Sequence, residues 1–241
     1  MYSVPPLSPP GKRWVIPDLH GCARTFDRVL EHLQLSPNDQ LFLLGDYVNK
    51  GPGSREALER VMELVAGPLQ VFPLRGNHEQ IYLELPYDYE ALAERLGPLE
   101  QCSLFDAQGK VLPRHIEFIK TLPLYYELES YLLVHAGLDF SLDNPYEDAN
   151  SLLNIRRFPV PENFPKTIIH GHHPHPLDAI QTAISDEAKV IPLDNGCVYV
   201  GEREDSGNLL ALELNTRKLI IQPYVDPPRT KNQAALAGDS T

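Results

Sequence analysis

Residues 41–54, Leu-Phe-Leu-Leu-Gly-Asp-Tyr-Val-Asn-Lys-Gly-Pro-Gly-Ser, constrain the fold of this chain more than any other stretch. The stretch begins with four apolar residues, a pattern typical of a strand buried on both faces. It continues as a loop with Gly45, Gly51 and Gly53 and a single carboxylate, Asp46. A buried strand that ends in a lone carboxylate and a glycine-rich loop indicates a ligand site rather than packing alone.

Strand and helix patterns alternate along the first half of the chain. Apolar strands are predicted at residues 14–17, 41–44 and 69–74. Between them, apolar residues recur with the spacing i, i+3, i+4, i+7 of one helix face, at Phe26, Val29, Leu30 and Leu33 and again at Leu58, Val61, Met62 and Val65. This order predicts parallel strands joined by right-handed crossovers. Ligands bind such sheets at the carboxyl ends of the strands, where Asp18, Asp46 and Asn77 fall.

The second half of the chain has a different pattern. Residues 124–128 and 131–134 are predicted to form a hairpin, and residues 147–153 a weak helix. Asp194-Asn195-Gly196 is a turn signal. Further short strands are predicted at 166–169, 179–184, 190–193, 197–200, 209–214 and 219–223.

A length of 241 residues suits one domain with a sizeable core. We expect residues 13–225 to form this domain, preceded by a proline-rich surface arm at 1–12 and followed by a disordered tail at 226–241. Residues 80–122 look mostly helical, most clearly at 90–96 and 115–122, and we expect this insertion to wall the substrate cleft without contacting metal ions.

Charge and composition exclude several classes of partner. The formal net charge of −12 argues against a nucleic-acid groove, which needs a basic face. No stretch approaches the length of a membrane span. The three cysteines, Cys22, Cys102 and Cys197, form neither a disulfide framework nor a zinc pattern. We therefore expect a cytoplasmic protein that binds neither nucleic acid nor membranes.

Six residues offer carboxylate, imidazole or amide ligands for two divalent ions: Asp18, His20, Asp46, Asn77, His135 and His172. The first three would bind one ion and the last three the other. Asp46 would bridge the ions, which would lie about 3.5–4 Å apart. Ions so placed would share a water, lower its pKa and direct the hydroxide at phosphorus for in-line displacement. His78 remains as a general acid for the leaving oxygen.

Five motifs, at residues 17–21, 45–51, 75–79, 135–137 and 171–174, resemble those of the phosphoprotein phosphatase family of metallophosphoesterases. Residues 193–199 are similar to a segment of the small bacterial and phage members. The resemblance, over about residues 13–224, implies an α/β fold in which two mixed β-sheets, flanked by helices, form a four-layer αββα sandwich with the site at one edge.

The resemblance assigns the same six ligands and the acid His78. It implies two divalent ions, manganese first, with iron, zinc, magnesium or nickel as other candidates. Arg156 matches a phosphate-binding arginine of the family, and we prefer it to Arg157. Asn77 and Lys50 would also contact phosphate. Pro174 agrees with the phosphoprotein branch, since many phosphodiesterases carry a second metal-binding histidine there, and His170, His173 and His175 are then expected to be supporting or surface groups.

The second motif departs from the family pattern at two residues, because Asn49 and Lys50 replace an Asp-Arg pair. Pro17 also replaces a glycine of the family, a smaller change because a proline can end a strand. We expect Asn49 to accept a hydrogen bond from the imidazole of His78, but not to stabilise imidazolium by charge. Lys50 offers phosphate a point charge instead of a bidentate fork.

The favoured function is a phosphomonoesterase, a serine/threonine or dual-specificity protein phosphatase acting on a phosphoprotein or a small phosphorylated molecule. The first alternative is a diadenosine tetraphosphate hydrolase, because such enzymes resemble this chain and also lack the Asp. They carry a long insertion after the His-Ala-Gly motif, however, and only 32 residues separate Gly137 from His170 here. The second alternative is a phosphate-binding pseudophosphatase, and the oligomeric state stays open.

Overall fold

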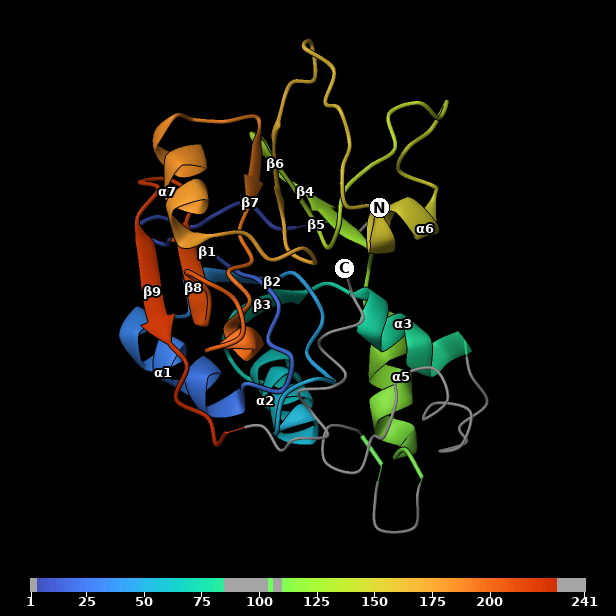
Figure 1. Ribbon diagram of the computed structural model, residues 1–241, viewed down its shortest axis with the longest axis vertical. Helices are drawn as coiled ribbons and strands as arrows, with labels where there is room; N and C mark the ends of the chain where they lie inside the picture. Colours follow the sequence, from blue (N-terminus) through green and yellow to red (C-terminus); the bar gives the residue numbers. More distant parts are fainter. Residues whose placement is uncertain (1–3, 85–103, 106–109, 229–241) are drawn as a thin grey trace.

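The computed structural model describes residues 4–84, 104–105 and 110–228. Two mixed β-sheets pack face to face and are flanked by helices (Figure 1), which confirms the predicted fold class. The first sheet has the strand order β3-β2-β1-β8-β9, with β1 at Arg13–Ile16, β2 at Gln40–Leu43, β3 at Gln70–Pro73, β8 at Asn208–Glu213 and β9 at Leu219–Pro223. The second has the order β4-β5-β6-β7, with β4 at Tyr125–Glu127, β5 at Tyr131–Val134, β6 at Thr167–His170 and β7 at Val190–Pro192.

The predicted parallel arrangement of the first three strands is confirmed. Strands β1 and β2 pair in parallel with Trp14 opposite Leu41, and β2 and β3 pair in parallel as well. Strand β8 then pairs antiparallel with β1 on its other side. In the second sheet, β4 and β5 form the predicted hairpin, while β5, β6 and β7 run parallel.

Side chains of successive strand residues point to opposite faces of a sheet, and here both faces are apolar. Val15 and Phe42 pack with Leu133 of the second sheet in the layer between the sheets. Their neighbours Ile16 and Leu43 belong to the cluster on the outer face of the first sheet. A slip of one residue in register would therefore exchange two buried sets of side chains.

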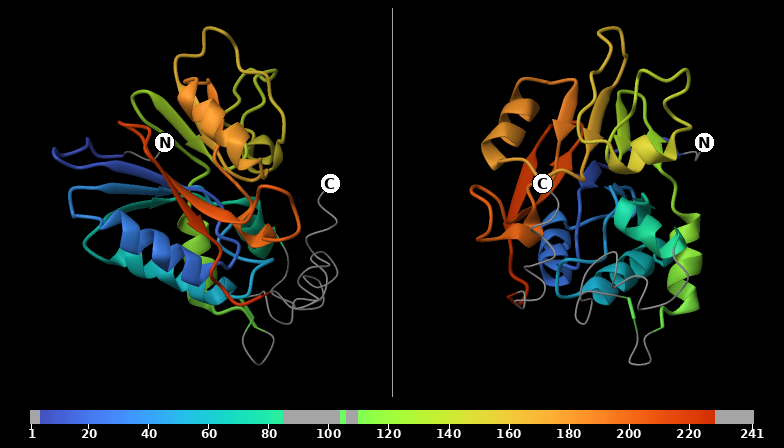
Figure 2. Two further views of the ribbon diagram at one scale, coloured as in Figure 1. Left: turned by 60° about the vertical axis from the view of Figure 1, so that its left-hand side comes forward. Right: turned by 45° about the vertical axis from the view of Figure 1, so that its right-hand side comes forward.

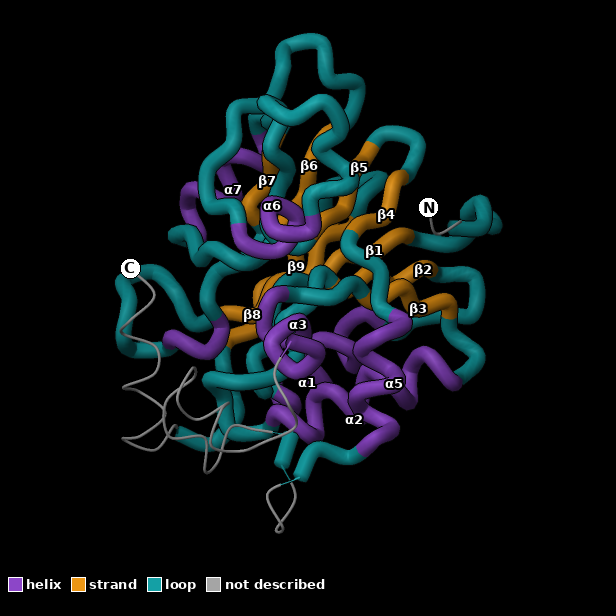
Figure 3. The backbone as a smooth tube through the Cα atoms, turned by 90° about the vertical axis from the view of Figure 1, so that its right-hand side faces the viewer, coloured by secondary structure: helices purple, strands orange, loops and turns teal. Residues whose placement is uncertain are grey.

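Helices cover the outer faces of the sandwich. Their bounds are α1 Ala23–Leu33, α2 Ser54–Ala66, α3 Asn77–Glu84, α5 Pro113–Thr121, α6 Ala149–Asn154 and α7 Leu177–Ser185, with a short 3₁₀ helix, η1, at Cys197–Tyr199. Helices α1 and α2 lie beneath the first sheet, and α7 lies beside β7 (Figure 2). Seen from the side, α3 and α5 join α1 and α2 in one group, while α6 and α7 lie across the sheets from it (Figure 3).

Two predicted strands are wrong. Residues 179–184 lie in helix α7, which begins directly after Pro176 and buries Ile180 and Ile184 one turn apart. Residues 197–199 form η1, because Gly196 adopts a left-handed conformation (φ 65°) that ends the extended path of the chain.

The described parts of residues 80–122 belong to the main body. Tyr82, Leu104 and Ile119 are buried in the same apolar cluster as α1 and α2, and α3 packs against α5. The predicted helix at 90–96 lies outside the described residues. No described helix combines the length and the apolar character that crossing a membrane requires.

Asp226, assigned to the tail by the sequence, is buried and fixes the start of α1. Its carboxylate accepts hydrogen bonds from the backbone N–H groups of Arg24 (2.9 Å) and Thr25 (3.0 Å) and from the Thr25 hydroxyl (2.6 Å). The residue preceding α1, Cys22, makes no side-chain cap. A residue about two hundred positions away therefore satisfies two of the free N–H groups at the start of this helix.

Asp226→Ala should lower the free energy of unfolding by about 1–2 kcal/mol, because the loss of a helix cap costs that much. Thermal or urea unfolding followed by circular dichroism would measure the change. Asp143→Ala, which removes an exposed carboxylate, is the matched control. Equal stability of the two variants would contradict this account of Asp226.

Candidate metal centre

All six predicted metal ligands meet at one edge of the sandwich. Asp18 and His20 follow β1, Asp46 follows β2, and Asn77 begins α3 just after β3; His135 and His172 follow β5 and β6 of the second sheet. The carboxyl ends of parallel strands from both sheets thus converge, as the rule for open α/β sheets predicts.

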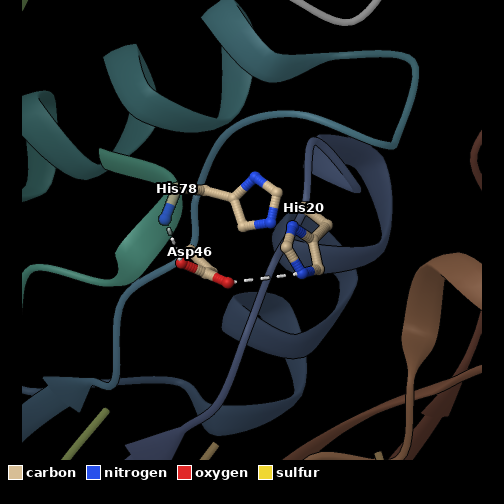
Figure 4. Close-up of side chains that lie close together, drawn as sticks. All are labelled: His20, Asp46 and His78. Atoms are coloured by element: carbon tan, nitrogen blue, oxygen red, sulfur yellow. Dashed lines mark hydrogen bonds and ion pairs between the residues drawn. The ribbon is translucent and has the colours of Figure 1, made fainter. Parts of the chain in front are cut away.

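Asp46 lies between two groups of ligand atoms. Its Oδ2 faces His20 Nε2 at 3.5 Å, and its Oδ1 faces His135 Nε2 at 3.5 Å. The backbone N–H of His78 donates to Oδ1 at 2.9 Å (Figure 4). Ligand atoms of His20, Asp46 and His78 form one compact group, and those of Asp46, His135 and His172 form another. Because Asp46 belongs to both groups, its carboxylate is placed to bridge two ions.

The imidazole contacts fit a cation better than they fit hydrogen bonds alone. His135 Nδ1 lies 2.9 Å from the carbonyl oxygen of Leu44, so this nitrogen carries the proton and Nε2 has a lone pair. That lone pair lies 2.9 Å from another acceptor, Asn77 Oδ1. His172 Nδ1 lies 3.0 Å from the same oxygen. Neighbouring ligands bound octahedrally at about 2.1 Å to one ion lie about 3 Å apart, so the three atoms have the spacing of a coordination shell.

The other half of the centre contains His20 and Asp18. His20 Nδ1 lies 3.2 Å from the carbonyl of Val48, so its Nε2 presents a lone pair. This Nε2 is 3.8 Å from Asp18 Oδ2 and 3.2 Å from Lys50 Nζ. Both oxygens of Asp18 accept from the backbone N–H of His172, at 3.0 and 3.1 Å. The ammonium of Lys50 thus lies beside the metal ligand His20, and its charge interacts favourably with the carboxylates of Asp18 and Asp46.

The backbone of the centre is strained. Five site residues have positive φ: His20 (43°), Asp46 (52°), Asn49 (67°), Lys50 (67°) and His172 (65°). Each such residue costs on the order of 1–3 kcal/mol and persists only when its surroundings fix it. Glycine permits the tightest approaches, because a Cβ at Gly171 would lie 2.0 Å from Asp18 Oδ1 and a Cβ at Gly76 would lie 2.1 Å from Asp46 Oδ1.

Glu79 fixes the loop that carries Asp46, and the sequence-based prediction omits it. Its buried Oε2 accepts from the N–H groups of Asp46 (2.7 Å) and Gly76 (3.0 Å), and its Oε1 accepts from Tyr47 N–H (2.8 Å). The signal in the sequence is its position, one residue after His78 in a glycine-containing loop.

Burial removes the carboxylates of the centre from water and therefore disfavours their charged forms unless positive charge lies nearby. It raises the pKa of Asp46 to about 7, although Lys50 acts in the opposite direction. Burial, with the charges of Asp194 and Asp46, also raises the pKa of Asp18. The imidazoles respond in the opposite sense, since burial lowers the pKa of His135 to about 3. Anionic oxygens and neutral imidazoles form the donor set that divalent cations need.

A polar cavity of about 60 Å³ opens onto these ligands. It is far smaller than the roughly 300 Å³ of a pocket that encloses a drug-sized ligand, so only one end of a large substrate fits inside. Arg156, which the family resemblance assigns to phosphate, lines the cavity, whereas Arg157 is not among its described lining residues. The lining consists of Lys50, Asn77, His78, Arg156, His172, His173, Pro174, Tyr199 and Arg203.

The contact between Asn49 and His78 differs from the prediction. The Tyr82 hydroxyl donates to Asn49 Oδ1 at 2.7 Å, and Asn49 Nδ2 lies 3.0 Å from His78 Nδ1. With its oxygen engaged by Tyr82, the amide presents a donor and not an acceptor to the imidazole. His78 Nδ1 is therefore the acceptor, and its proton lies on Nε2. Tyr82 was missed because it lies in residues 80–122, which were expected to wall the substrate cleft and were given no contact with the catalytic groups.

Of the remaining histidines, His173 lines the cavity, whereas His170 and His175 are not among its described lining residues. His170 is buried, and its ring packs edge-on against Phe158 with centroids 5.6 Å apart. His173 and His175 form a similar pair at 5.0 Å.

Comparison with known proteins agrees with this geometry. The calcineurin-like phosphoesterase family matches residues 11–211. A symmetrical bis(5'-nucleosyl)-tetraphosphatase from Aromatoleum aromaticum is 33% identical over 126 residues, which cover 52% of this chain and 44% of the relative. A protein of the same name from Coxiella burnetii is 35% identical over 135 residues, covering 55% and 44%. The matches span less than half the length of these curated relatives.

Solved structures show the same fold. A crystal structure provisionally named a diadenosine tetraphosphatase has a TM-score of 0.62 and 20% identity, covering 90% of this chain and 95% of its own. A serine/threonine phosphatase from Saccharomyces cerevisiae has a TM-score of 0.56 and 18% identity, covering 94% and 84%.

Asp46→Asn should abolish turnover and lower metal occupancy, because a neutral amide cannot bridge two cations. In the unsubstituted chain, apparent metal affinity should rise between about pH 6 and pH 8, since ions compete with the proton of Asp46. Titration calorimetry with manganese and elemental analysis would measure both effects. The control Asp143→Asn should bind like the unsubstituted chain, and two ions per chain in Asp46→Asn would refute the bridging role.

Proposed function

This chain belongs to the calcineurin-like phosphoesterase family, and from that membership we propose that it hydrolyses phosphoanhydride bonds of dinucleoside polyphosphates such as diadenosine tetraphosphate. The preference for a protein phosphatase drawn from the sequence is thereby reversed. Named relatives with at least 33% identity are symmetrical tetraphosphatases, whereas the protein phosphatase resembles this chain at 18% identity, which speaks for the fold alone.

The observation that carries the proposal is the contact between Asn49 and His78. A neutral amide that donates to Nδ1 leaves His78 without charge stabilisation as imidazolium. Such a group suits leaving oxygens that need little protonation. A phosphate leaving group has a pKa of about 6, so a nucleoside diphosphate departs readily as an anion. A serine or threonine alkoxide, by contrast, must receive a proton in the transition state.

The other residues of the cavity then have simple roles. Lys50 and Arg156 bind non-bridging oxygens of the phosphoryl group, and Asn77 lies beside them. The Nε2–H of His78 donates a hydrogen bond to the departing oxygen. Divalent ions, when bound, supply the Lewis acidity that polarises the phosphoryl group and acidifies a water.

A phosphomonoesterase remains the second candidate, favoured by one feature. Residues 138–166, between β5 and β6, contain one short helix, α6, and otherwise loops and turns. Of the described residues that line the cavity, this segment contributes Arg156 alone, which is less than the enclosure of two nucleosides would require.

A substrate panel tests the proposal directly. The manganese-loaded chain should convert diadenosine tetraphosphate with kcat/KM at least about a hundredfold above that for phosphoserine peptide, as expected if alkoxide protonation costs about 3 kcal/mol more. Chromatography of the nucleotides would identify the product, which we expect to be two molecules of adenosine diphosphate.

The reverse preference would favour the protein phosphatase. Failure to release nitrophenol from nitrophenyl phosphate, together with inertness toward every member of the panel, would indicate a pseudophosphatase.

Asn49→Asp should speed hydrolysis of phosphoserine peptide selectively and extend it to higher pH. Burial, with the charge of Lys50, lowers the pKa of His78, so the imidazolium form is lost as pH rises through that lowered value. A carboxylate beside Nδ1 raises the pKa and retains the acid to higher pH. Single-turnover rates on phosphoserine peptide and nitrophenyl phosphate across pH would measure this. The control Asn38→Asp, at an exposed position, should leave both profiles unchanged, and equal gains for both esters would remove the role given to Asn49.

A further inference from the structure

Arg203 lies in a short segment between η1 and β8 that none of the recognised motifs includes. Its guanidinium lies over the ring of Tyr199, 4.4 Å from the centroid. Tyr199 is buried, whereas Glu202 and Glu204 on either side of Arg203 are exposed. Arg203 is half-buried and lines the same cavity as His78 and His172.

The segment that carries Arg203 is anchored by hydrogen bonds. Glu202 N–H donates to the carbonyl of Tyr199 at 3.0 Å, and the Ser206 hydroxyl donates to the carbonyl of Arg203 at 2.9 Å. Asn195 Nδ2 donates to the carbonyl of Asp205 at 2.7 Å. With its backbone fixed and its side chain stacked, Arg203 loses little further freedom when it binds a ligand.

The charge of the cavity opposes that of the whole chain. The formal net charge is −12, yet the described residues that line the cavity include Lys50, Arg156 and Arg203 and no carboxylate. Lys50 also lies near the Tyr199 ring, 5.5 Å from its centroid. Two cations beside one ring repel each other. The buried carboxylate of Asp194 interacts with both charges, since Lys50 and Arg203 each lower its pKa, and an anionic ligand between them would offset the repulsion further. In the proposed function Lys50 and Arg156 bind one phosphoryl group, which leaves the guanidinium of Arg203 as a third cation in the cavity.

We propose that Arg203, positioned by the ring of Tyr199, binds a second anionic group of the substrate, adjacent to the phosphorus under attack. The planar fork of guanidinium matches the oxygens of phosphate. This inference rests on the proposed function and deepens it, because it makes consecutive phosphate groups the feature that the site selects. A lone phosphate monoester would leave Arg203 unused.

Binding of simple anions tests the inference without relying on turnover. Titration calorimetry on the manganese-loaded chain, with manganese in excess over the anion, would compare inorganic tripolyphosphate with orthophosphate. In Arg203→Ala, the Kd for tripolyphosphate should rise about tenfold or more relative to that for orthophosphate, the range expected for one charge-assisted hydrogen bond. Arg28→Ala, which removes an exposed arginine of α1 that pairs with Glu31, controls for net charge.

The part played by Tyr199 is tested in the same assay. Tyr199→Phe keeps the ring and should keep the preference for tripolyphosphate, whereas Tyr199→Leu should lose it. Melting temperatures would confirm that each variant is folded. An unchanged preference in folded Arg203→Ala, or an equal loss of both anions, would overturn the inference. Failure of the proposed function would appear separately, as absence of turnover of diadenosine tetraphosphate by the unsubstituted chain.

Discussion

Two buried carboxylates held next to each other are the constraint on which the rest of this site depends. Glu79 grips the backbone N–H of Asp46, and burial raises the pKa of Glu79 to about 8, with the charge of Asp46 as the next cause. Water cannot relieve this concentration of negative charge. The ammonium of Lys50 meets this electrostatic need in part, and divalent ions, when bound, would meet it further. The neutral imidazoles around the carboxylates would offer such ions lone pairs.

The fold meets this need through backbone geometry more than through side-chain packing. Parallel strands of two sheets deliver short loops to one edge, and in those loops residues such as Asp46 and His172 adopt left-handed conformations that favour glycine. Gly76 lies against the carboxylate of Asp46, and Gly171 lies against that of Asp18, at distances that leave no room for a Cβ atom. Strain and close approach therefore occur at the atoms that carry the chemistry.

Much of this arrangement could be predicted from the sequence, and the failures have physical reasons. The parallel pairing of the first three strands and the convergence of polar residues at strand ends were predictable, because apolar periodicity and polar residues that follow strands are local signals. Residues 179–184 were mistaken for a strand because a short apolar run fits both the period of a helix and the period of a strand. The orientation of the Asn49 amide was not predictable, since it depends on Tyr82, a contact that only the folded chain creates. Arg203 belongs to none of the recognised motifs, and it becomes a candidate only because the folded chain places it in the lining of the cavity.

Strand β1 pairs with β8, and Asp226 caps α1, so elements near the start of the domain depend on residues about two hundred positions later in the sequence. During synthesis, one edge of β1 and the first turn of α1 must wait for residues that emerge about two hundred positions later. At ribosomal rates of roughly 5–20 residues per second, this wait lasts on the order of 10–40 s. Throughout this wait, one edge of β1 is unpaired in the nascent chain, and an unpaired edge can pair with other chains. The pairing of β8 with β1 ends this exposure.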